Sequence, residues 1–67
     1  MTAEELTEKV KAALGILTDD ADTNNQLRIK ALAVMRYINN GGGAVTLDNA
    51  SEYEIQCIAL GVNDLLN

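Results

Sequence analysis

Histidine, tryptophan, phenylalanine and proline are all absent from this 67-residue chain, and cysteine occurs only once. Histidine is the usual general base and a frequent metal ligand near neutral pH, so its absence removes the common basis for acid–base catalysis and for a metal centre. Cys57 has no cysteine partner within the chain and no imidazole or neighbouring cation to activate its thiol, and we interpret it as a small packing residue. We therefore expect no enzymatic activity, no cofactor and no metal.

Long apolar runs and an excess of positive charge are missing as well. No stretch approaches the roughly 20 apolar residues that cross a bilayer, and acidic residues stand where a signal peptide is basic. Ten acidic and five basic residues give a net charge of −5, which disfavours binding to nucleic-acid phosphates. We expect a soluble protein, made in the cytoplasm, that does not act at a membrane.

Two short segments fail as ligand sites. A calcium loop that begins at Asp20 requires Gly and Glu where this chain has Asn25 and Ala31. The expected role of the acidic turn, residues 19–22, is therefore helix capping, with a weak surface cation site as the alternative. The three glycines at 41–43 are not followed by Lys and Ser or Thr, so we interpret them as a hinge or loop tip and not as a phosphate loop.

What the chain does contain is three stretches with helical periodicity and a recognisable start. Thr2, Thr23 and Ser51 each precede a Glu or Gln by three residues, which is the spacing of a capping box. For the second helix, Asp20 is an alternative cap. We predict an all-α fold with a single domain, 1–67: a small three-helix bundle with a Gly-rich loop between the second and third helices. The predicted helices span about 2–14, 23–39 and 51–66.

Apolar residues recur at three- or four-residue spacing along one side of each predicted helix. Gly15 is the expected end of the first helix, and Ile16 and Leu17 are expected to tuck under the bundle. Gly61 lies inside the third helix, where glycine costs about 1 kcal/mol relative to Ala, and a close helix contact would explain it. The predicted core stripes are Leu6, Val10, Ala13 and Leu14; Leu27, Ala31, Val34, Met35 and Ile38; and Ile55, Ile58, Ala59, Val62, Leu65 and Leu66.

The second and third helices also carry apolar residues behind their core stripes. A small domain buries only one face of each helix, so a second apolar face indicates a partner. The alternative interpretation is that these are scattered exposed apolar residues, which are ordinary on any protein surface. The basic residues Arg28, Lys30 and Arg36 point about 100° to 200° apart, unlike those of a helix that reads nucleic acid. We expect them to be solvated or to form ion pairs between subunits. The candidate subunit-interface residues are Ile29, Leu32, Arg36, Tyr53, Cys57 and Leu60.

One succession of residues has a counterpart in a known family. An opening of Val10, Lys11, Leu14 and Ile16 is followed by the acidic Asp19, Asp20 and Asp22, and then by a helix with Leu27, Ala31, Tyr37 and Ile38. This succession resembles the small head–tail connector, or adaptor, proteins of long-tailed bacteriophages, also described as DNA-packaging proteins. Gly15 departs from the family pattern, which often has Arg there, and members of the family commonly continue into a further helix or tail.

The resemblance implies a structural protein of the virion. Its copies, about a dozen, would form a ring beneath the portal protein and above a tail or stopper protein, at the head–tail junction, after assembly in the host cytoplasm. DNA would pass through the ring without specific binding, which suits a negatively charged chain. The main alternative is a small acidic helical interaction module, such as a regulator or an antitoxin-like dimer. An acyl-carrier protein would need Asp-Ser-Leu at a helix start, and Ser51 follows Ala50 and precedes Glu52.

Overall fold

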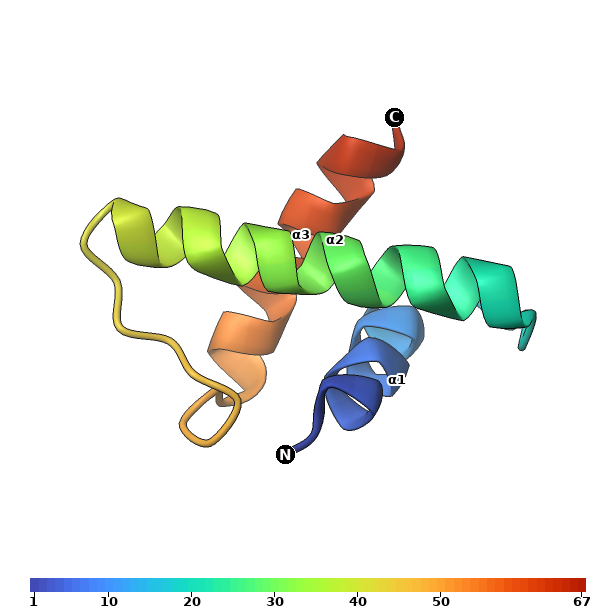
Figure 1. The fold of residues 1–67 in the computed structure, drawn as a ribbon, viewed down its shortest axis with the longest axis horizontal. Helices are drawn as coiled ribbons and strands as arrows, with labels where there is room; N and C mark the ends of the chain where they lie inside the picture. The colour runs from blue at the N-terminus through green and yellow to red at the C-terminus, as the bar shows by residue number, and fades with distance from the viewer.

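The computed structural model describes every residue from Met1 to Asn67 and contains three helices and no strand. Helix α1 spans Ala3–Leu14, α2 spans Ala21–Asn40 and α3 spans Glu52–Leu66. α3 crosses behind the middle of α2, while α1 lies against the N-terminal half of α2 (Figure 1). Each helix contacts both of the others. The predicted all-α three-helix bundle is confirmed.

Both ends of α1 follow from its sequence. The Thr2 hydroxyl accepts a hydrogen bond from the backbone N–H of Glu5 at 3.1 Å, and the Glu5 carboxylate accepts one from the Thr2 N–H at 2.9 Å. At the other end Gly15 has a φ of +72°, a conformation that favours glycine. The N–H of Ile16 then reaches back to the Lys11 carbonyl at 2.9 Å, which completes a Schellman motif.

The start of α2 differs from the first prediction. The predicted capping box of Thr23 with Gln26 is wrong, and the alternative cap, Asp20, is the one used. Its carboxylate accepts hydrogen bonds from both the backbone N–H and the hydroxyl of Thr23, at 2.9 and 3.1 Å. A carboxylate makes a charge-assisted bond and is also stabilised by the positive end of the helix dipole, so the helix begins earlier, at Ala21.

The predicted capping pair of α3 is confirmed. The Glu54 carboxylate accepts hydrogen bonds from the Ser51 hydroxyl at 2.6 Å and from its backbone N–H at 3.1 Å. The preceding Gly-rich loop is held against the end of α2, because the Asn39 side chain bonds to both the N–H and the carbonyl of Val45 at 2.8 Å. Gly42, with a φ of +104°, lets the chain leave α2 in this direction.

Nine buried apolar residues form the core, and all of them belong to the predicted stripes. Three predicted members are exposed instead, namely Ala13, Leu65 and Leu66. The two leucines lie in the last turn of α3, which projects beyond its crossing with α2 (Figure 1). The apolar spacing of α3 thus continues along the sequence beyond the part of the helix that its neighbours cover. The core residues are Leu6, Val10, Leu27, Ala31, Val34, Ile55, Ile58, Ala59 and Val62.

Gly61 lies at the point where α3 meets α2. A Cβ atom at this position would stand 2.6 Å from Cγ1 and 3.0 Å from Cγ2 of Val34. The close helix contact expected from the sequence is therefore present. None of the three helices combines the length and the apolar character needed to cross a membrane.

Candidate interaction surfaces

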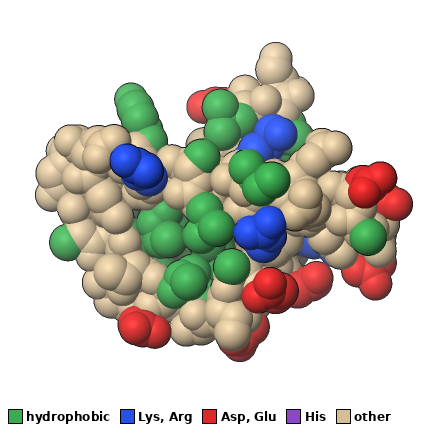
Figure 2. Space-filling view, in the orientation of Figure 1, with side chains coloured by type: hydrophobic (Ala, Val, Ile, Leu, Met, Phe, Trp, Pro, Cys, Tyr) green, Lys and Arg blue, Asp and Glu red, His purple; other side chains and the backbone are tan.

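The outward side of α2 carries exposed apolar and basic residues. Ile29 is 53% exposed and Tyr37 is 78% exposed, and Ala33 and Arg36 lie exposed beside them. We call these four residues the α2 face. Figure 2 shows this side of the molecule, with apolar and basic side chains over its middle and acidic side chains mainly at the right-hand end and along the lower edge. Leu32, also a candidate, is only partly exposed because it packs against the core.

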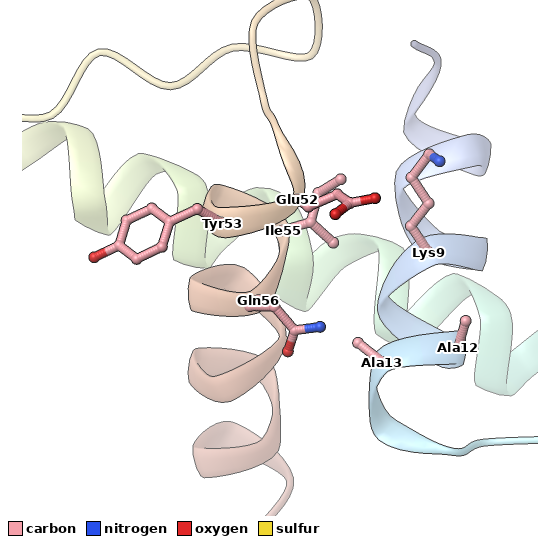
Figure 3. A pocket seen from close by; sticks show the side chains of 7 residues that line it. All are labelled: Lys9, Ala12, Ala13, Glu52, Tyr53, Ile55 and Gln56. Carbon is pink, nitrogen blue, oxygen red and sulfur yellow. The ribbon is translucent and has the colours of Figure 1, made fainter.

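The outward side of α3 forms a second surface. Tyr53 and Leu60 lie two turns apart, are 75% and 65% exposed, and flank Cys57, which is half-buried. We call these three residues the α3 face. In Figure 3 Tyr53 points away from α1. The α2 face and the α3 face lie on two helices that cross each other (Figure 1). The structure therefore divides the candidate interface residues between two helices.

Between the C-terminal halves of α2 and α3 lies a groove of about 350 Å³, which we call the α2–α3 groove. Sequence reasoning missed this groove, since Leu65 was assigned to the core and Tyr37 to the family pattern. Gly61 is the signal that could have found it, because a glycine inside a helix marks a side with no side chain. The lining residues are Ala33, Val34, Tyr37, Gly61, Asp64 and Leu65.

A wider and more polar hollow of about 590 Å³ separates α1 from α3 (Figure 3). Ala12 and Ala13 line its α1 side, and their short side chains do not reach α3. This explains why Ala13 is exposed although its position in the helix repeats the core spacing. The remaining lining residues are Lys9, Glu52, Tyr53, Ile55 and Gln56.

Lys11 has a structural role that its sequence position alone does not show. It is only 5% exposed, and its ammonium lies 3.6 Å from carboxylate oxygens of both Glu8 and Asp19. The side chain of Asn24 donates a hydrogen bond to the same Asp19 oxygen at 3.1 Å. The Asn24 hydrogen bond, and secondly the charge of Lys11, lower the pKa of Asp19 below its ordinary value of 3.8. The acidic turn is thus tied to α1.

The acidic turn is therefore used for structure. Asp19 pairs with Lys11 and Asp20 caps α2. No group of three or more His, Cys, Asp or Glu residues is arranged to hold a metal ion. The capping role expected for this turn is confirmed at Asp20.

Leu17 is 96% exposed, so the expectation that it tucks under the bundle is wrong. Its neighbour Ile16 does pack against the core, as predicted. The physical reason lies in the two flanking anchors: the Schellman motif turns Ile16 inward, and Asp19 is drawn to Lys11. The residue between these anchors is left facing solvent.

Comparison with protein-family models, with curated proteins and with solved structures finds no match for this chain. The resemblance to head–tail connectors therefore rests on the amino-acid sequence alone. The exposed surfaces of α2 and α3 are the structural features from which a function can be proposed.

Proposed function

We propose that this chain is a structural protein that assembles head-to-tail into a ring and serves in the head–tail connector of a tailed bacteriophage. The observation that carries the proposal is the presence of two separate exposed apolar faces, one on α2 and one on α3. A two-fold dimer pairs one patch with itself and would leave the other face in water. A head-to-tail contact covers both, because the α2 face of one copy meets the α3 face of the next.

The charges of the two helices support the same pairing. Helix α3 contains the carboxylates Glu52, Glu54 and Asp64 and no basic residue, whereas α2 contains three basic residues. None of these basic side chains forms an ion pair within the monomer. Charges of opposite sign on the two helices would guide association and disfavour contact between like helices.

The placement in a head–tail connector comes from the family resemblance and the net charge of −5. Lys11 and the acidic turn belong to that family pattern, and here they form one ion-paired unit between α1 and α2. In a ring, a negatively charged wall neutralises few phosphates, so DNA would slide past it without sticking. A portal or major capsid gene beside the gene for this chain is the genomic observation that we expect.

The test uses two complementary variants, Ile29→Glu on the α2 face and Leu60→Glu on the α3 face. Both side chains are more than half exposed, so neither change should disturb folding, and circular dichroism will check this. Leu32 is a poorer choice because it packs against the core. Ala44→Glu, in the exposed part of the loop, is the matched control for added charge.

Native mass spectrometry, with and without the portal protein, should show rings for the natural chain and for the Ala44→Glu control. Each face variant alone should remain monomeric. An equimolar mixture of the two should form dimers and nothing larger, because Leu60→Glu retains an intact α2 face and Ile29→Glu an intact α3 face. A natural chain that stays monomeric under both conditions contradicts the proposal. A stable dimer that tolerates either substitution would instead support the acidic interaction module.

A further inference from the structure

Leu17 is the most exposed large apolar side chain of the molecule, at 96%. An isolated exposed leucine is ordinary on a protein surface. This one differs because the backbone on both sides of it is held in place. The Ile16 N–H bonds to the Lys11 carbonyl at 2.9 Å, and the Asp19 carboxylate is bound by Lys11 and Asn24. A side chain presented from a held turn loses little conformational entropy on binding.

The α2–α3 groove offers an apolar site that nothing in the monomer fills. Two of its lining residues, Tyr37 and Leu65, are 78% and 55% exposed. Leu17 of the same molecule does not reach it, because the turn precedes Ala21 and Ala33 lies about 18 Å further along α2 at about 1.5 Å per residue. The groove is therefore open to a side chain from a second molecule.

Charge complementarity indicates which molecule that is. The turn that presents Leu17 carries Asp19, Asp20 and Asp22. On α2, Lys30 and Arg36 lie three residues before and after the groove residue Ala33, and neither forms an ion pair in the monomer. Two cations on α2 therefore lie within one helical turn of Ala33, whereas the groove lining itself contains the single carboxylate of Asp64. An acidic turn that presents an apolar residue complements this groove. This chain itself contains such a turn, which indicates a second copy of the chain as the partner.

We propose that Leu17 of one copy inserts into the α2–α3 groove of the next copy, with its acidic turn against Lys30 and Arg36. The inference rests on the head-to-tail assembly proposed above and identifies a specific contact within it. It predicts that removing the Leu17 side chain weakens self-association without altering the fold, since that side chain touches little in the monomer.

The first experiment compares Leu17→Ser with Leu17→Met and with the control Thr18→Ala, by analytical ultracentrifugation. We expect Leu17→Ser to weaken self-association about tenfold or more, as the loss of a buried leucine implies, while the other two remain close to the natural chain. Unchanged association of Leu17→Ser overturns the inference.

The second experiment locates the contact directly, in a background with Cys57→Ala whose assembly is first compared with that of the natural chain by native mass spectrometry, because Cys57 belongs to the α3 face. Proteins carrying Leu17→Cys and Ala33→Cys are mixed and treated with a short bismaleimide cross-linker. A cross-linked heterodimer is expected from this pair, and none from Leu17→Cys mixed with Ala44→Cys. If rings form but the pair does not cross-link, the inference fails while the proposed function stands. If the natural chain never self-associates, with or without portal protein, both fail.

Discussion

The contact between Gly61 and Val34 leads to a prediction whose sign depends on one neighbouring side chain. Replacing Gly61 by Ala places a Cβ atom 2.6 Å from Cγ1 of Val34, well inside the normal contact distance. Val34 cannot move aside easily, because a valine in a helix has one strongly preferred side-chain rotamer and this one is 7% exposed. We expect the substitution to force the two helices apart or to strain this rotamer.

The magnitude follows from two opposing terms. Overpacking a core contact costs about 1–3 kcal/mol, whereas Gly to Ala inside a helix gains about 1 kcal/mol. Gly61→Ala should therefore lower the free energy of unfolding by about 0–2 kcal/mol in the natural chain. In a Val34→Ala background the obstructing methyl groups are gone, and the same substitution should raise the free energy of unfolding by about 1 kcal/mol.

Urea denaturation followed by circular dichroism measures all four members of this double-mutant cycle. The measurement is made at concentrations where the protein is monomeric, because self-association would itself add stability. Asn63→Ala, an exposed position of α3, is the control for helix propensity alone. We expect the Gly61→Ala effect to differ by about 1–3 kcal/mol between the two backgrounds. Equal effects in both would refute the assignment of Gly61 to a close helix contact.

Two further predictions concern the acidic turn. Asp20→Ala should lower the free energy of unfolding by about 1 kcal/mol in urea denaturation, because Asp20 is the N-cap of α2. Thr23→Ala should lower it clearly less. A larger effect for Thr23→Ala than for Asp20→Ala would contradict this assignment. The lowered pKa of Asp19 contributes stability above its ordinary value of 3.8 and loses it as the pH falls through the lower folded-state value. The free energy of unfolding, measured between about pH 2 and 6, should therefore fall less steeply with acid for Asn24→Ala, which lacks the largest cause of that pKa shift. An identical pH dependence in Asn24→Ala and the natural chain would contradict the assignment of the shift to Asn24.

Most of the fold could be predicted because its signals are local. The capping pairs at Thr2 and Ser51 involve residues three apart, and the end of α1 needs only a glycine that adopts a positive φ. Helix periodicity located every core residue. It failed where neighbouring helices end or leave space, as at Ala13 and Leu65, because periodicity states which side a residue occupies and not what lies opposite it.

The candidate interaction surfaces were predicted less completely. Periodicity correctly placed Ile29 and Leu60 on the outward sides of their helices. It did not show how these two sides are oriented relative to each other, since that depends on how α2 and α3 cross. Leu17 was misplaced because the anchor that turns the chain away from it, the pairing of Lys11 with Asp19, joins residues on different elements.

The sequence by itself determined three helices, the caps of α1 and α3 and an apolar stripe on each helix, because hydrogen bonding and side-chain direction within a helix depend on residues at most four positions apart. The tertiary structure decided where the stripes end, which groove stays open and which leucine faces solvent. Those features depend on distances between helices, and only the packed arrangement of α1, α2 and α3 sets them.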